Sequence, residues 1–166
     1  MDMFQMDWWR EEVDKMAEGQ NQGNIEYIRA FYKNVSVAID KIEYGINLKR
    51  NIAQKKLAEA VKQGASESEL EKIEKGGEPS KSNVERLEDL KAIMSRFVSL
   101  QVESLAEPIN ERRRAIVGGS LKLSVYTELE QLSKLREELK NSQYYIKTGS
   151  NLSSEERKNK EPGFEE

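Results

Sequence analysis

Cysteine and histidine are both absent from this 166-residue sequence. Without cysteine the chain has no disulfide framework and no thiolate metal site. Without histidine it lacks the commonest general base and the commonest metal ligand of proteins. The two absences disfavour most hydrolytic and zinc chemistry, and we expect neither a cofactor nor a bound metal.

Motifs that carry catalysis are lacking as well. Gly118-Gly119-Ser120 has neither the lysine nor the preceding glycine of a phosphate-binding loop. Acidic pairs such as Glu137-Glu138 are adjacent in sequence, so their side chains diverge on a helix and do not converge on one ligand. The sequence therefore predicts a protein that is not an enzyme and has no catalytic residues.

Apolar residues are sparse, at 37% against 34% charged residues, where about 45–50% and about 25% are typical. No run approaches the roughly 20 apolar residues that span a bilayer, and the amino terminus lacks the pattern of a signal peptide. Such a composition suits long helices that each bury one apolar stripe. We expect a soluble, cytoplasmic, all-α protein: an elongated antiparallel helical hairpin or coiled coil with a short N-terminal helix and a third C-terminal helix.

The predicted organisation is a single elongated domain over residues 1–147, followed by a polar tail over 148–166 that is expected to be disordered. Pro108 is expected to kink the second long helix, because proline removes a backbone donor. Within the tip, Ser66 and Glu69 form a pattern typical of a capped short helix, an alternative to a continuous loop. The predicted parts are a short aromatic-rich helix (1–23), a first long helix (24–63), a tip loop (64–81), a kinked second long helix (82–117) and a third helix (120–147).

The first long helix has the clearest apolar pattern, a seam that we interpret as a surface for packing and oligomerisation. Asn24 is a natural N-cap at its start. Continuing this heptad beyond Ile46 reaches Lys49, which is charged, so the apolar pattern is interrupted there. We therefore expect the helix to bend near Gly45 and the apolar positions beyond the bend to be Leu48, Ile52, Leu57 and Val61. The seam residues alternate spacings of three and four: Ile25, Ile28, Tyr32, Val35, Ile39, Ile42 and Ile46.

The same helix is the one clearly basic element of a chain with net charge −3. Residues 24–63 carry eight bases and four acids, whereas residues 1–23 carry six acids and two bases. A positive stripe suits an anionic partner, although a solvated helix also needs charge for solubility. The acidic flanks and the pI of about 5.4 disfavour nucleic acid. Candidate contacts with acidic lipid or an acidic partner are Lys41, Lys49, Arg50, Lys55, Lys56, Arg112, Arg113 and Arg114.

Two of these features have alternative interpretations. Arg112 to Arg114 span about 200° of helix surface, and they either pair with acids of the first long helix or the amino terminus, or form an anion-binding face. The preference of arginine for carboxylates favours pairing.

The N-terminal docking candidates Phe4, Trp8 and Trp9 either pack, on the hairpin or across a dimer, or insert into a bilayer interface. The acids around them favour packing.

The segment Lys41-Ile-Glu-Tyr-Gly-Ile-Asn-Leu-Lys-Arg50 resembles the second helix of F-BAR domains, dimeric curved helical modules that bind membranes. The matching positions are Glu43, Tyr44, Leu48, Lys49 and Arg50. Glu107-Pro108-Ile109 and the aromatic start, Phe4 to Trp9, are also similar to that family, and the likeness in helix order covers roughly residues 4–145. It implies a dimer that buries the seam and presents Lys49, Arg50, Lys55 and Lys56 to acidic phospholipid.

The favoured hypothesis is a non-catalytic structural or scaffolding protein that self-associates, or docks into a larger assembly, through its coiled-coil helices. The first alternative is a peripheral, BAR-like module that engages acidic phospholipids through the basic helix. A further alternative is an adaptor whose polar tail folds on a partner.

Overall fold

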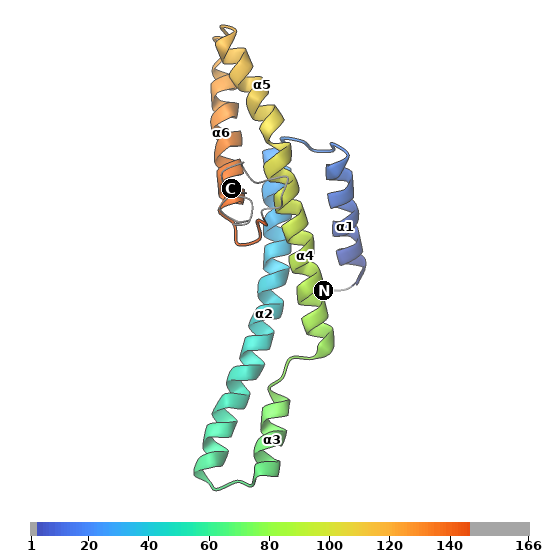
Figure 1. Ribbon diagram of the computed structural model, residues 1–166, viewed down its shortest axis with the longest axis vertical. Coiled ribbons are helices and arrows are strands. Elements are labelled where there is room, and N and C mark those ends of the chain that lie inside the picture. The colour runs from blue at the N-terminus through green and yellow to red at the C-terminus, as the bar shows by residue number, and fades with distance from the viewer. Residues whose placement is uncertain (1–2, 147–166) are drawn as a thin grey trace, which may run out of the picture. The chain divides into compact units, whose positions relative to one another are not determined.

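The computed structural model describes residues 3–146, and the regular structure within that range is helical. This confirms the predicted all-α fold class. The tail over 148–166, for which we expect disorder, lies outside the described residues. The helices are α1 (Met3–Ala17), α2 (Ile25–Lys62), α3 (Glu67–Gly76), α4 (Lys81–Ser104), α5 (Ala106–Val117) and α6 (Leu123–Lys140) (Figure 1).

The boundaries of α2 and the start of α3 follow the capping signals of the sequence. Asn24 caps α2, because its Oδ1 accepts a hydrogen bond from the backbone N–H of Tyr27 at 3.1 Å. α2 ends two residues before Gly64, which has a φ of +76° that glycine adopts without strain. Ser66 begins α3, since its Oγ accepts from the backbone N–H of Glu69 at 3.3 Å. The segment predicted as a tip loop over 64–81 therefore contains the capped short helix.

The chain divides into two compact units, and both long helices contribute to each of them. The first unit is Phe31–Ala92, which holds most of α2, all of α3 and the first half of α4. The second unit combines the described chain up to Ala30 with the described chain from Ile93 onward. Because α2 and α4 run through both units, this division does not contradict the prediction of one domain, which stays a prediction.

In the first unit the chain returns along α2 as an antiparallel hairpin. α3 runs beside the C-terminal part of α2 (Figure 1), and Gly77 lies against Ala53. Further along, Lys91 of α4 forms an ion pair of 3.1 Å with Glu43 of α2. The return arm of the hairpin is therefore made of two helices, α3 and the first half of α4.

In the second unit the last part of α4 is the central helix. α1 contacts it through an ion pair of 2.6 Å between Asp14 and Arg96, and α6 contacts it through Arg136, which donates to the carbonyl of Val102 at 2.8 Å. α1 buries Met6, Trp9, Val13 and Met16, and α6 buries Leu132, Leu135 and Leu139. From Ile93 onward the buried residues of α4, together with Leu105 just after its end, form two adjacent columns with a spacing of four: Ile93, Phe97, Gln101 and Leu105, and Met94, Val98 and Val102.

Pro108 accounts for the break between α4 and α5 at Leu105. Proline has no backbone N–H, so the carbonyl of Ser104, four residues earlier, loses its helical partner. The side chain of Gln22 replaces that partner, because its Nε2 donates to the Ser104 carbonyl at 3.1 Å. Pro108 then lies in the first turn of α5, where proline is tolerated. The disruption predicted at Pro108 is confirmed, but the kinked helix predicted over 82–117 is two helices.

Gly77 and Gly76 provide a matched test of the hairpin. A Cβ at Gly77 would collide with the Cβ of Ala53, whereas a Cβ at Gly76 would meet no neighbouring atom. We expect Gly77→Ala to lower the free energy of unfolding by about 1–3 kcal/mol, the usual effect of overpacking. Gly76→Ala should be neutral or stabilising by up to about 1 kcal/mol, because alanine favours a helix more than glycine does. Urea unfolding followed by circular dichroism measures both, and equal effects would contradict this packing.

Tyr27 gives a pH-dependent test of how α1 covers the start of α2. Its hydroxyl oxygen is enclosed, and the carboxyl group of Glu12 lies beside it. Burial raises the pKa of Tyr27 above 10.0, and the charge of Glu12 and its hydrogen bonding to the hydroxyl raise the pKa further. Folding therefore disfavours the ionised form, so the contribution of Tyr27 to stability is intact below pH 10.0 and declines as the pH rises through the folded-state pKa.

We expect Tyr27→Phe to be close to neutral at about pH 8 and to be more stable than the wild type at about pH 11, where the unfolded tyrosine ionises freely. The measurement is the free energy of unfolding of both proteins at the two pH values. Because the wild type and the variant share all other tyrosines, the difference between their free energies of unfolding reports on Tyr27 alone. Parallel pH profiles would show that α1 does not enclose this hydroxyl.

Candidate functional site

The seam of α2 is used inside the chain. Ile28, Val35 and Ile39 have no exposed surface, and Ile46 is also buried. The other seam residues, Ile25, Tyr32 and Ile42, are half-buried. The packing role predicted for the seam is therefore accounted for within one chain, and an association surface has to be sought elsewhere.

A second apolar row runs along the opposite face of α2. Val37, Tyr44 and Leu48 each lie two residues from a seam residue, and two residues turn a helix by about 200°. Together with Ile52 they keep between 43% and 69% of their surface exposed. We call Val37, Tyr44, Leu48 and Ile52 the outer stripe. It is the most extended apolar surface that the first unit leaves open among the described residues.

The prediction that Leu48 and Ile52 take over the seam is wrong. Beyond Ile46 the inward face passes to Ala53 and Leu57, which line a groove against the return arm. Those two positions continue the three-and-four alternation of the seam, whereas Leu48 and Ile52 fall on the far side of the helix. Val61 is exposed as well, so of the four predicted successors only Leu57 faces inward. α2 is continuous through Gly45, and the bend there stays a prediction.

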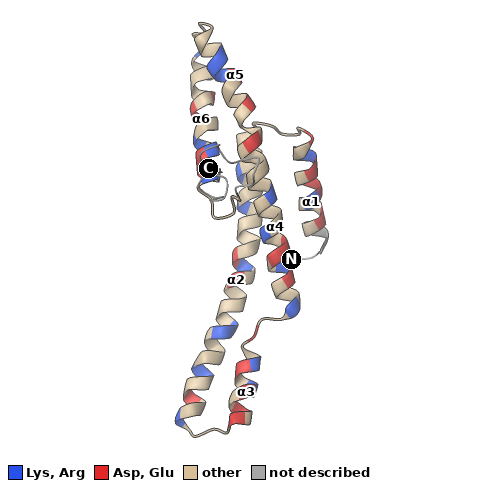
Figure 2. Cartoon of the chain, viewed as in Figure 1, with Lys and Arg blue, Asp and Glu red and all other residues tan. Residues whose placement is uncertain are grey.

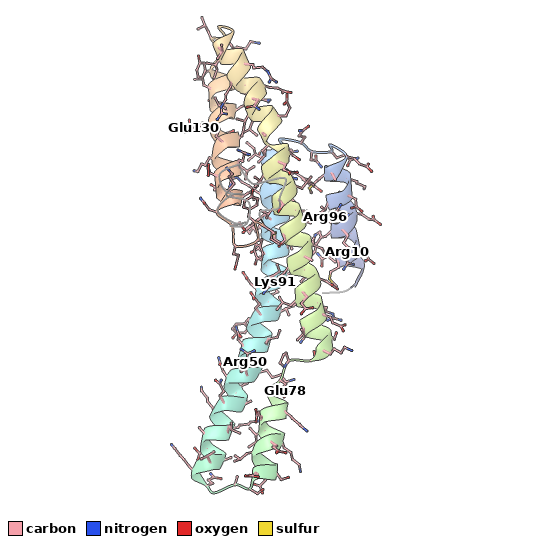
Figure 3. All side chains as sticks on the ribbon, in the orientation of Figure 1. Arg10, Arg50, Glu78, Lys91, Arg96 and Glu130 are labelled. Atoms are coloured by element: carbon pink, nitrogen blue, oxygen red, sulfur yellow. The ribbon has the colours of Figure 1, made fainter. Side chains whose placement is uncertain are left out.

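The groove of the first unit has a volume of about 440 Å³. Arg50 reaches it from α2, and Glu78 reaches it from the segment after α3 (Figure 3). Its other lining residues are Ala53, Gln54, Leu57, Glu74, Gly77 and Pro79, a set without a hydroxyl or thiol nucleophile. Within residues 3–146 no three acidic side chains gather closely enough to hold a metal ion. The groove offers charge pairing and apolar contact, and the lack of catalysis stays a prediction.

The basic candidates of α2 do not share one face, although basic positions recur along its length (Figure 2). At 100° per residue, Lys41 and Lys55 lie beside the outer stripe and Lys49 and Lys56 lie on one flank. Arg50 points into the groove. The four lysines are exposed, and none forms an ion pair with a described residue. The basic face that the F-BAR resemblance implies is thus divided among three sides of the helix.

The arginine triplet of α5 is mostly engaged within the chain. Arg112 donates to Glu128 of α6 from Nε at 3.3 Å and from Nη2 at 2.9 Å, and Arg114 pairs with Glu107 at 2.8 Å. The intramolecular interpretation is confirmed for these two, but their partners lie in α5 and α6 rather than in the first long helix or the amino terminus. Arg113 is exposed and has no ion pair with a described residue.

The two tryptophans of α1 have different surroundings. Trp9 is buried with the apolar face of the helix, which fits the packing interpretation, whereas Trp8 is 51% exposed. The side chain of Phe4 is not among those that the structure describes. The predicted N-terminal docking set therefore contributes one core residue and one surface aromatic.

A cluster that sequence reasoning missed lies at the turn between α5 and α6. Val117, Leu121 and Leu123 are the most exposed large apolar residues described, and Tyr126 lies close to them in sequence. The available signal was the position of aliphatic residues on both sides of Gly118-Gly119-Ser120, outside the stripe that α6 buries.

Arg112 and its neighbour Arg113 provide a matched pair for the α5–α6 contact. Arg112→Ala should lower the free energy of unfolding by about 1–2 kcal/mol, because it removes a partly buried, charge-assisted contact and leaves Glu128 without its partner. Arg113→Ala should change it by less than about 0.5 kcal/mol, since the side chain is exposed. Thermal and urea unfolding of both variants measure this difference, and similar losses would exclude the Arg112–Glu128 contact as a stabilising one.

None of the helices among residues 3–146 combines the length and the apolarity that crossing a bilayer requires. The resemblance to F-BAR domains rests on the residues quoted above and stays a prediction. Comparison of the chain with protein-family models, with curated proteins and with solved structures finds no match.

Proposed function

We propose that this chain is a non-catalytic scaffolding protein that self-associates through the outer stripe of α2. The observation that carries the proposal is that a helix already buried along one seam has four large apolar side chains exposed on its opposite face. Removing apolar surface from water is favourable by about 25 cal/mol per Å². A helix apolar on two faces is expected where a second helix covers the second face.

The charges beside the outer stripe are compatible with a second copy of the same chain. Consider an antiparallel pair in which Leu48 of one copy faces Ile52 of the other. Position 50 is then the midpoint of the contact, and Lys41 of one copy faces Glu59 of the other, because these two residues are equally far from position 50. Both Lys41 and Glu59 are exposed. A parallel pair would instead place Lys41 beside Lys41, which is repulsive. We therefore favour the antiparallel arrangement.

Such a contact uses the same surface on both copies. An isologous contact closes at two copies and does not continue into a filament. The scaffold would thus be a dimer held by α2, in which the seam of each chain keeps its packing role. This differs from the dimer implied by the F-BAR resemblance, in which the seam itself is buried between copies.

The first experiment is sedimentation velocity on the full chain over a range of micromolar concentrations. The wild type is expected to form a dimer. Leu48→Asp should weaken the dimerisation affinity by at least about tenfold, since it removes a leucine that the dimer would bury and places a charge in the contact. Val117→Asp is the control, because it changes an exposed aliphatic residue outside the outer stripe. Both variants should keep the helical circular dichroism of the wild type. A wild type that remains monomeric contradicts self-association.

The register is tested by exchanging charges. Lys41→Glu and Glu59→Lys should each weaken the dimer, because each places like charges across the contact. The double variant restores an opposite pair and should regain most of the affinity. Failure of the double variant to recover would reject the antiparallel register while leaving the outer stripe, tested separately by Leu48→Asp, as the contact surface.

A further inference from the structure

The turn between α5 and α6 exposes three aliphatic side chains almost completely. Val117, Leu121 and Leu123 have 88%, 92% and 78% of their surface accessible, more than any residue of the outer stripe. We call Val117, Leu121 and Leu123 the apolar tip. Its residues come from the end of α5, the connecting segment and the start of α6, all in the second unit.

Hydrogen bonds order this turn. The backbone N–H of Ser120 donates to the carbonyl of Ala115 at 2.9 Å, and Gly119 adopts a φ of +93° that completes the end of α5. On the other side, the hydroxyl of Tyr126 donates to the carbonyl of Ser120 at 3.3 Å. The apolar tip is therefore carried by a defined turn whose polar backbone groups are largely satisfied locally.

The charge around the apolar tip has one sign. Residues 113–127 include Arg113, Arg114 and Lys122 and not a single Asp or Glu, although 30 of the 166 residues of the chain are acidic. At that frequency fifteen residues would ordinarily hold two or three acids. The amino end of α6, which begins at Leu123 without a side-chain cap, adds the positive end of a helix dipole. The segment 113–127 thus combines apolar and cationic groups and contributes no acidic side chain of its own.

We propose that the apolar tip docks on the surface of an acidic phospholipid bilayer. The aliphatic side chains would enter the boundary between headgroups and acyl chains, while Arg113 and Lys122 contact the lipid phosphates. A protein partner fits this feature less well, because a stable protein interface buries about 1,200–2,000 Å² in total and a protruding turn presents little surface. A fluid lipid interface requires no complementary shape.

This membrane site differs from the one predicted on α2. It uses neither the basic residues of α2 nor the outer stripe. A test of membrane binding at the apolar tip is therefore independent of a test of self-association. Arg114 contributes less than its neighbours, because its guanidinium is already paired with Glu107. Arg113 and Lys122 have no ion pair with a described residue and are the cations available to lipid.

The first test is cosedimentation of the full chain with vesicles of phosphatidylcholine that contain or lack phosphatidylserine. We expect binding to the acidic vesicles only, weakened by high salt. Leu121→Ser combined with Leu123→Ser should reduce binding at least tenfold, and Lys122→Ala should reduce it about fivefold, the effect of one cation near an acidic surface. Val61→Ser is the matched control, because it removes an exposed aliphatic residue of α2 outside the outer stripe.

A second measurement locates the inserted residue. Because the chain contains no cysteine, Leu121→Cys carries the only thiol and accepts an environment-sensitive fluorophore at one position. Its emission should shift to the blue with acidic vesicles, whereas the same label on Val61→Cys should not shift. A wild type that ignores acidic vesicles, tip variants that bind like the wild type, or a label on Leu121→Cys that stays in water would each overturn the proposal.

Discussion

Burial of the two columns of mainly apolar side chains at the C-terminal end of α4 is the interaction on which the second unit depends. One neighbouring helix covers one column, so the last part of α4 needs helices on two sides, and α1 and α6 supply them. Phe97, Val98 and Leu105 have no exposed surface, and each fully buried side chain of this kind contributes about 1.5–3 kcal/mol. Pro108 ends the central helix just beyond these columns, and α5 then pairs with α6 to form the turn that carries the apolar tip.

α2 follows a different rule, because it is apolar on two opposite faces. Its seam is covered within the chain, and in the first unit the small residues Ala53 and Gly77 let the return arm approach it closely. The outer stripe has no such cover among the described residues. The helix that stabilises the fold therefore also carries the surface that we propose for self-association, so substitutions on its two faces should separate stability from assembly.

Helix positions were largely predictable from the sequence. Which face of each helix is buried against the rest of the chain was not. Periodicity gave the seam, and the signals at Asn24 and Ser66 gave the helix starts. The misassignment of Leu48 and Ile52 has a physical origin: when both faces are apolar, the period alone does not say which face the return arm covers. That choice depends on contacts between distant residues, as does the pairing of Arg112 with Glu128. Exposure of the apolar tip likewise depends on distant contacts, since no helix among the described residues covers it.

The central claim is that α2 packs with its seam and leaves the outer stripe open, and one matched pair tests it most directly. Ile39→Ala and Ile52→Ala delete the same atoms from one helix, at a fully buried and a half-exposed position. The measurement is the free energy of unfolding at a dilution where the chain is monomeric. We expect Ile39→Ala to lose about 2–5 kcal/mol and Ile52→Ala less than about 1 kcal/mol. Equal losses, or a larger loss at Ile52, would contradict this assignment of the two faces.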